Sequence, residues 1–365
     1  MREKGNADIS KVSVIIPAYK PDEKLIKLLG ELVTIGFTDI LVVNDGSGEA
    51  FAPIFEKVRA FSECTLLTHE ENKGKGMALK TAMSFFAEHR KDYTGVVTAD
   101  ADGQHLPKDI AAVAQEVTGQ SKVILGVRDF SKSDIPARSV AGNRITSAVF
   151  ALFFGMKLKD TQTGLRGIPA KYLETLLAAG GDRYEYETNQ LLMLNKYNIP
   201  YEQVEIATVY IDENQTSHFH VVRDSLRIYG LILKYVFSSS ASFVIDALLF
   251  YVVKKWGVSP FDFLPLTFFA SLVARAVSSV VNYVLNAKLV FQDNVNRATF
   301  VKYYILVVVQ ILISALCVFV LENTFEILSP ALSTVLKILV DTILFFFSFR
   351  IQHKWVFDSR KKDGE

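Results

Sequence analysis

Two acids and an amide follow a short apolar segment near position 100, and their spacing is that of a cation site. The segment reads Val97-Thr98-Ala99-Asp100-Ala101-Asp102-Gly103-Gln104-His105. Alternate residues of an extended chain point the same way, so Asp100, Asp102 and Gln104 can converge. Hard oxygen ligands of this kind suit Mg²⁺ or Mn²⁺ shared with a diphosphate. An exposed acidic turn is the alternative, but acids directly after a buried strand favour a site.

Three other motifs precede this one. Val42-Val43-Asn44-Asp45-Gly46-Ser47-Gly48 places an acid after a strand, where it can accept hydrogen bonds from a nucleoside; a plain Asp-Gly turn also fits. Asn72-Lys73-Gly74-Lys75-Gly76 is a glycine-rich turn that opens a helix, which suits an anionic ligand or a simple cap. It lacks the spacing of a Walker A loop. Pro17-Ala18-Tyr19 ends the first apolar run.

The elements that must position these motifs alternate between strand and helix patterns. Strands are predicted at Val12–Ile16, Ile40–Val43, Cys64–Thr68, Gly95–Thr98 and Val123–Val127. Helices are predicted at Pro21–Thr34, Ala50–Phe61, Gly76–His89 and Pro107–Thr118. Strands that are apolar throughout and separated by helices indicate a mostly parallel, Rossmann-like α/β sheet. Ligands bind at the carboxyl ends of the strands of such a sheet, which is where the four motifs fall.

Apolar residues are concentrated in the last third of the chain. Half of the 365 residues are hydrophobic, the net charge is +1 and the mean hydropathy is +0.24. The charge gives no reason to expect a nucleic-acid partner. Four apolar stretches near 235–253, 264–285, 300–321 and 331–351 are each long enough to span a bilayer. We therefore expect two domains, 1–228 and an all-α, four-helix transmembrane domain at 229–365.

Loop charges and the first residues predict the orientation. The second loop and the C-terminal tail are basic, whereas Glu322 and Glu326 mark the third loop. Lys254 and Lys255 in the first loop disagree, but both lie at a helix end. The polar residues 1–10 do not read as a signal peptide, and the two cysteines fit free thiols. We expect a multi-pass protein of the cell membrane with the catalytic domain and both termini in the cytoplasm. Arg275, inside the second span, is expected to neutralise Asp246 or Asp341.

Taken together, the ordered motifs resemble those of the family 2 inverting glycosyltransferases. P-A-Y, N-D-G-S, N-K-G-K-G-M-A-L and D-A-D-G-Q-H resemble most the dolichyl-phosphate-mannose synthase-like branch, over about residues 11–215. Asp160-Thr161-Gln162-Thr163-Gly164-Leu165-Arg166 and Tyr184-Glu185-Tyr186-Glu187 resemble the same branch. The last third is similar to GtrA-like membrane domains, at Ala274-Arg275, Asn282-Tyr283, Asn286-Ala287-Lys288 and residues 349–357.

This resemblance implies a GT-A fold and a metal-dependent hexosyltransferase. It would move one sugar from a nucleotide-sugar, a UDP- or GDP-hexose, to an undecaprenyl- or dolichyl-type polyprenyl phosphate at the cytoplasmic membrane face. The resemblance implies that Asp100 and Asp102 are catalytic and that Asp100, Asp102 and Gln104 hold Mg²⁺ or Mn²⁺. The implied donor-binding residues are Pro17, Tyr19, Asp45, Lys75 and Asp100. Lys20-Pro21 stand where the mannose synthases have Asn-Glu, so a UDP-sugar is at least as well supported as a GDP-sugar.

A lipid phosphate is already anionic near neutral pH, so its transfer needs positioning and cations instead of a general base. Arg128 follows a strand where the family places a phosphate-contacting arginine, and Arg138 precedes the apolar segment Val140–Phe154. We expect both arginines to bind the acceptor phosphate while this segment, as a helix, rests on the bilayer; an ordinary core helix is the alternative. A lipid-linked sugar transporter with a non-catalytic transferase domain is the alternative function. The sequence leaves a homo-oligomer open.

Overall fold

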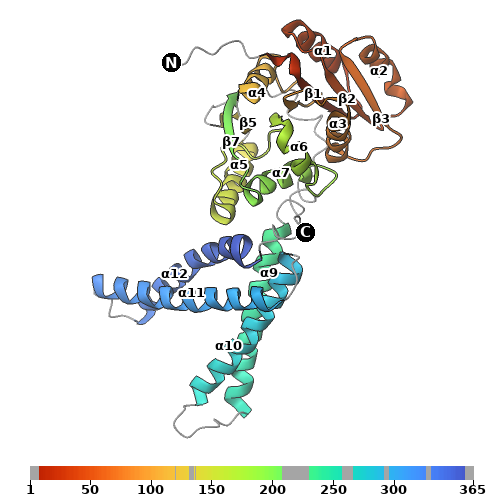
Figure 1. Cartoon of the computed structure of the whole chain (residues 1–365). Coiled ribbons are helices and arrows are strands. Elements are labelled where there is room, and N and C mark those ends of the chain that lie inside the picture. Colours follow the sequence, from red (N-terminus) through yellow and green to blue (C-terminus); the bar gives the residue numbers. More distant parts are fainter. Residues whose placement is uncertain are drawn as a thin grey trace. The chain divides into compact units, whose positions relative to one another are not determined.

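The structure is a computed structural model that describes residues 8–119, 121–130, 135, 137–207, 230–256, 266–291, 296–325 and 330–357. The chain divides into two compact units, Met1–Ile228 and Tyr229–Glu365. Figure 1 shows a sheet with surrounding helices in the first unit and long helices alone in the second.

The first unit is built on one seven-stranded sheet with the order β3-β2-β1-β4-β6-β5-β7. All neighbouring strands are parallel except β6, which runs antiparallel to β4 and β5. The prediction of a mostly parallel sheet is confirmed, and the five predicted strands are present. The strands are β1 (Val12–Ala18), β2 (Ile40–Asp45), β3 (Cys64–His69), β4 (Gly95–Thr98), β5 (Val123–Arg128), β6 (Arg166–Pro169) and β7 (Tyr201–Ile206).

Helices cover both faces of this sheet. Helix α1 contacts α2 and α4, and α3 contacts α6 and α7, so these helices form two groups (Figure 1). Their bounds are α1 (Glu23–Ile35), α2 (Ala52–Arg59), α3 (Lys75–His89), α4 (Pro107–Gly119), α5 (Ala137–Val149), α6 (Ala170–Leu177) and α7 (Glu185–Lys196). The 3-10 turn η2 (Glu49–Phe51) precedes α2, and the π-helical turn η3 (Phe150–Phe154) extends α5. The helix predicted at Val140–Phe154 is therefore the end of α5 plus η3.

Helix α1 shows how the local sequence fixes an element. The carboxylate of Asp22 accepts a hydrogen bond from the Lys24 amide at the start, and Gly36 ends the helix with a φ of 112°. Leucines at 25, 28, 29 and 32 form its buried face. Burying a leucine contributes roughly 1.5–3 kcal/mol, so this face holds α1 against the sheet.

Strand register brings the polar motifs to one edge of the sheet. Ala18 pairs with Asn44 and Asp45 pairs with His69, so β1, β2 and β3 end at the same level. Strand β4 ends earlier, and the Ala99 amide then donates to the Ile15 carbonyl at 2.9 Å. The residues that follow β4 therefore leave the sheet beside the last residues of β1.

The described part of the second unit contains four long helices. They are α9 (Gly230–Trp256), α10 (Leu266–Leu285), α11 (Arg297–Thr324) and α12 (Pro330–Ile351), with the π-helical turns η5 (Asn286–Val290) and η6 (Gln352–Val356). Helix α9 packs along α10, and α11 along α12. Helices thus occupy all four predicted spans. Within the described residues, two segments are long and apolar enough to cross a membrane, Ile232–Val253 and Arg297–Ser314. A domain of four spans stays a prediction.

A buried polar network joins these helices. Asn286, fully buried, accepts from the Ser238 hydroxyl at 2.7 Å and donates to Asn282 at 2.6 Å and to Gln352 at 2.9 Å. Gln352 donates in turn to Ser348 at 3.0 Å. The side-chain amide of Asn286, in η5, therefore links α9, α10 and η6.

Two acids in these helices bond to hydroxyls. Asp246 accepts from Ser278 at 2.8 Å, and Asp341 accepts from Ser314 at 2.5 Å. The side chain of Arg275 lies outside the described residues, so its predicted pairing with one of these acids stays a prediction.

Candidate active site

Three charged side chains from distant parts of the sequence meet at the carboxyl edge of the sheet. The ammonium of Lys75, in the first turn of α3, lies 2.7 Å from Asp100 Oδ1 and 3.0 Å from Glu187 Oε2. Asp100 follows β4, and Glu187 lies in the first turn of α7. The structure thus brings together two predicted site residues, Lys75 and Asp100, and adds Glu187.

These charges shift one another's protonation equilibria. Burial would lower the pKa of Lys75, but the negative charges of Asp100 and Glu187 outweigh burial and raise it above its ordinary value. Burial would likewise raise the pKa of Asp100, but the adjacent Lys75 ammonium lowers it to about 2. Both groups are therefore charged at neutral pH.

The pKa of Asp102 is shifted in the direction opposite to that of Asp100. Burial, and then repulsion from Asp100, raise the pKa of Asp102. One of its oxygens accepts from the Gln104 amide at 3.0 Å, which closes a tight turn after the strand. A cation bound between the two carboxylates would remove this repulsion.

His105 has a positioning role in this turn. Its Nδ1 accepts a hydrogen bond from the Asp100 amide at 3.0 Å. Burial lowers the pKa of His105 and keeps the ring neutral. The imidazole therefore holds the backbone at Asp100.

Asp45 organises the glycine-rich loop. Its carboxylate accepts hydrogen bonds from His69 Nδ1 at 2.7 Å, Asn72 Nδ2 at 3.0 Å, and the amides of Lys73 and Gly74 at 2.9 Å. These four bonds occupy the acceptor positions of a side chain that is 3% exposed. The predicted contact with a nucleoside stays a prediction, and it would have to displace one of them.

The glycines of this loop serve close packing. A Cβ on Gly74 would lie 2.5 Å from the Asp182 carbonyl oxygen, and one on Gly76 would lie 2.6 Å from Tyr186 Cβ. The Asp182 carbonyl also accepts from the Met77 amide at 2.9 Å. The chain itself thus satisfies this amide in the first turn of α3, and an anionic ligand at the start of the helix stays a prediction.

The other predicted donor residues lie beside this edge. Pro17 lies in β1 and pairs with Val43, and Tyr19 directly follows the strand. The next residue, Lys20, has a φ of 51°, and its amide donates to the Ser47 hydroxyl at 2.9 Å. The turn after β1 is therefore fastened to the loop after β2. Donor contacts of Pro17 and Tyr19 stay predictions.

Arg128 is held by Asp160, which was not among the predicted site residues. Its Nε lies 2.7 Å from Asp160 Oδ2 and its Nη2 lies 3.2 Å from Oδ1. The Asp160 side chain is fully buried, and it also accepts from the Gln162 amide at 2.9 Å. This pair fixes the plane of the guanidinium at the end of β5. Arg138 lies in α5, but its side chain is outside the described residues.

Arg166 holds the backbone at Glu187 by a hydrogen bond. Its Nη1 donates to the backbone carbonyl of Glu187 and, at 3.0 Å, to Gln190 Oε1. It is 3% exposed, and burial lowers its pKa below the usual arginine value. The acidic run at 184–187 was the only sequence signal for Glu187, because its contact is with Lys75, which is far from it along the chain.

The residues after β4 fit a divalent cation as part of a shared ligand set. Among the described residues, no three His, Cys, Asp or Glu side chains form a complete metal site. Asp100 and Asp102 offer two neighbouring carboxylates whose mutual repulsion a cation would relieve. Mg²⁺ is commonly held by one or two carboxylates plus substrate phosphates, so a diphosphate would complete the set.

Comparison with known proteins finds matches for both parts of the chain. The glycosyl transferase family 2 model matches residues 13–176, and the GtrA/DPMS transmembrane domain model matches residues 234–357. An uncharacterized protein of Methanocaldococcus jannaschii is 25% identical over 245 residues, which are 64% of this chain and 98% of that one. The UDP-N-acetylglucosamine–dolichyl-phosphate N-acetylglucosaminyltransferase of Methanococcus voltae is 28% identical over 240 residues, 61% of this chain and 95% of that one.

Among solved structures, mannosyl-3-phosphoglycerate synthase from Rubrobacter xylanophilus aligns with a TM-score of 0.47 and 17% identity, over 73% of this chain and 84% of that one. The two family matches cover both structural units. Residues 13–176 are therefore a family 2 glycosyltransferase domain and residues 234–357 a GtrA/DPMS transmembrane domain, which makes this chain a glycosyltransferase with a membrane domain.

Proposed function

We propose that this glycosyltransferase moves one sugar from a UDP- or GDP-hexose to a polyprenyl phosphate, with inversion and with a divalent cation, on a catalytic domain of the GT-A type. The charged cluster of Lys75, Asp100 and Glu187, beside Asp102, is the observation that carries the proposal. The relative from Methanococcus voltae, whose name gives a UDP-sugar donor and a dolichyl-phosphate acceptor, supports the substrate classes.

The donor would lie across the carboxyl ends of β1, β2 and β4. Asp100, Asp102 and Gln104 would hold the Mg²⁺ or Mn²⁺, which when bound supplies positive charge to the leaving nucleoside diphosphate. Pro17, Tyr19 and Lys75 would line the donor, with Asp100 shared between donor and cation. Asp45 would contribute by holding residues 72–74 in place.

The acceptor phosphate would attack without a general base. A phosphate monoester is already anionic near neutral pH, so the site needs only to position it. His105, the histidine beside the two acids, is buried and uses Nδ1 to accept from the Asp100 amide, so it is unsuited to taking a proton from an acceptor. Arg128 suits a phosphate, because Asp160 holds its guanidinium in one orientation and a fixed fork recognises phosphate oxygens well. Arg138 is proposed as the second cation.

The surface of α5 and η3 suits the acceptor's bilayer. Ile145 is 60% exposed and Leu152 is 45% exposed, one above the other at a spacing of seven residues, and Arg144 beside them is exposed. Apolar side chains next to a cation favour the membrane interface. On the other side of the helix Phe150, Phe153 and Phe154 are buried, so α5 and η3 combine the predicted surface helix with an ordinary core face.

We also propose that four helices span the membrane, with the catalytic domain and both termini in the cytoplasm. Among the basic residues, Lys288 lies in η5 after the second helix, Arg297 and Lys302 lie near the start of the third helix, and Lys354 lies in η6 after the fourth. Such residues collect on the cytoplasmic side of membrane proteins.

The test is transfer by the full chain in nanodiscs that contain polyprenyl phosphate. UDP- and GDP-hexoses are supplied with Mg²⁺ or Mn²⁺, and mass spectrometry detects the lipid product. We expect one hexose per lipid with one of the donors, and a loss of roughly 100-fold or more in turnover for Asp102→Asn.

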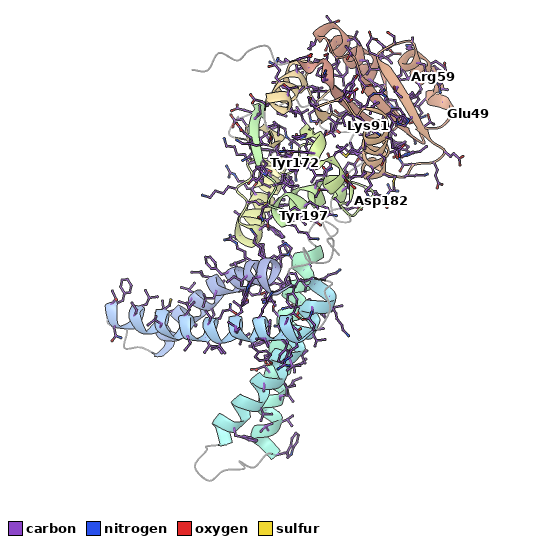
Figure 2. All side chains as sticks on the ribbon, viewed as in Figure 1. Glu49, Arg59, Lys91, Tyr172, Asp182 and Tyr197 are labelled. Carbon is purple, nitrogen blue, oxygen red and sulfur yellow. The ribbon has the colours of Figure 1, made fainter. Side chains whose placement is uncertain are left out.

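Asp182→Asn is the matched control, because Asp182 is 59% exposed and pairs with Lys80 outside the cluster; Figure 2 labels it in the loop before α7. Unchanged turnover in Asp102→Asn would refute the assigned site. Failure to form product with either donor and either cation would refute the transfer and favour the transporter.

A further inference from the structure

Lys75 is shared by two carboxylates of unequal accessibility. Its ammonium lies 2.7 Å from Asp100 Oδ1 and 3.0 Å from Glu187 Oε2. The Asp100 side chain is 27% exposed, whereas the Glu187 side chain is 11% exposed. Asp100 therefore faces the proposed ligand, and Glu187 lies behind it.

Glu187 has capacity for a further bond. Its Oε1 is buried and has no hydrogen-bond partner among the described residues. A buried carboxylate oxygen without a partner is costly, because it has lost its hydration. Since a carboxylate can only accept, a cation or another donor that moved onto Oε1 would relieve this cost.

Gly164 leaves room for such a movement. Its φ is outside the left-handed range, so the backbone does not require glycine. A Cβ there would lie 2.8 Å from Lys75 Nζ and 3.0 Å from both Asp100 Oδ2 and Glu187 Oε1. The ammonium and the unpartnered oxygen therefore border the same backbone position, with no side chain between them.

A divalent cation on Asp100 would compete directly with this ammonium. Two positive groups a few ångströms apart on one carboxylate repel each other strongly where water is scarce. The ammonium can lessen this repulsion by moving toward Glu187, which already holds it at 3.0 Å.

We propose that Lys75 is an exchangeable counter-ion: it pairs with Asp100 until a divalent cation takes that carboxylate, and it then transfers to Glu187. Glu187 is thus a positioning residue that sets cation affinity without touching the cation. The inference rests on the proposed function, because it takes the cation site at Asp100 and Asp102 from there.

The exchange is tested by a double-mutant cycle on Mn²⁺ affinity, measured by electron paramagnetic resonance on the full chain in detergent. We expect Lys75→Met to tighten Mn²⁺ binding roughly tenfold and Glu187→Gln to weaken it by a similar factor. In the Lys75→Met background, Glu187→Gln should change the affinity by less than about twofold, because no ammonium remains to be received. Lys75→Gln replaces Lys75→Met if the latter does not fold.

Two results would overturn the exchange. If Glu187→Gln changed the Mn²⁺ affinity equally in the wild type and in Lys75→Met, Glu187 would act only as a distant charge. An unchanged Mn²⁺ affinity in Gly164→Ala, which puts a methyl group between the ammonium and Glu187 Oε1, would contradict the route; we expect weaker binding.

Lys80→Met and Asp182→Asn form the matched control cycle. Lys80 lies in the same helix as Lys75, and Asp182 lies just before the helix that carries Glu187. The two side chains pair at 3.0 Å, and no described ion pair joins them to Asp100. Both substitutions should leave Mn²⁺ affinity within about twofold of wild type. Absence of Mn²⁺ binding to the wild type would overturn the proposed cation dependence and the exchange with it, whereas binding with additive effects overturns the exchange alone.

Discussion

Replacing Asn286 by leucine should destabilise the membrane domain. Leucine has the same number and branching of side-chain heavy atoms as asparagine but no polar group. Asn286 is fully buried and makes three side-chain hydrogen bonds, to Ser238, Asn282 and Gln352, at 2.6 to 2.9 Å. The substitution therefore removes the hydrogen bonds that link α9, α10 and η6 while it keeps the branched shape of the side chain.

The size of the effect follows from the number of bonds. Side-chain hydrogen bonds within membrane domains contribute on average about 0.6 kcal/mol each and at most about 1.7. Three such bonds give a loss of roughly 2–5 kcal/mol in the free energy of unfolding, since the buried partners are also left unsatisfied.

The measurement is unfolding of the purified chain by titration with a denaturing detergent, followed by helicity. Thr324→Val is the control, because Thr324 is exposed and its hydroxyl donates only to the Val320 carbonyl of its own helix. An Asn286→Leu protein within about 0.5 kcal/mol of wild type would show that the polar network is incidental to stability.

Four further predictions follow from the two domains. Arg90→Ala should cost roughly 1–3 kcal/mol in thermal unfolding of the full chain, because it leaves the buried Asp39 carboxylate without the guanidinium that bonds it at 2.9 and 3.0 Å; an unchanged melting temperature would contradict this. Asp45→Asn should raise the donor KM about tenfold and leave the lipid KM unchanged, since it loosens residues 72–74; equal changes in both constants would argue for general damage. Chelation with EDTA should stop transfer, and added Mn²⁺ or Mg²⁺ should restore it; activity that survives chelation refutes the cation site. A cysteine at Lys354 in a chain without Cys64 and Cys317 should react with impermeant maleimide in inside-out vesicles and not in intact cells, and the reverse pattern would invert the proposed orientation.

The local sequence was sufficient to predict those elements whose boundaries and buried face are set by their own residues. Helix α1 carries its own cap at Asp22, its apolar face and its final glycine, so its bounds were predicted to within two residues. The strands β1 to β5 were recognisable because a buried parallel strand must be apolar throughout. Strand β6 and helix α7 were not predicted, because each carries a charged residue, Arg166 or Glu187, that a sequence pattern would place at the surface. Both residues are buried because they contact each other in the folded chain.

The amino-acid sequence by itself determined the family motifs, the two-part organisation and the choice of Asp100 and Asp102, since alternation along an extended segment fixes which side chains converge. Only the tertiary structure decided what those residues contact. Asp45 turned out to hold a loop, Arg128 to be oriented by Asp160, and Lys75 to lie between Asp100 and Glu187. The physical reason is that these contacts join residues 25 to 112 positions apart in the sequence. Only the folding of the chain sets such distances, whereas periodicity reports on neighbours along one element.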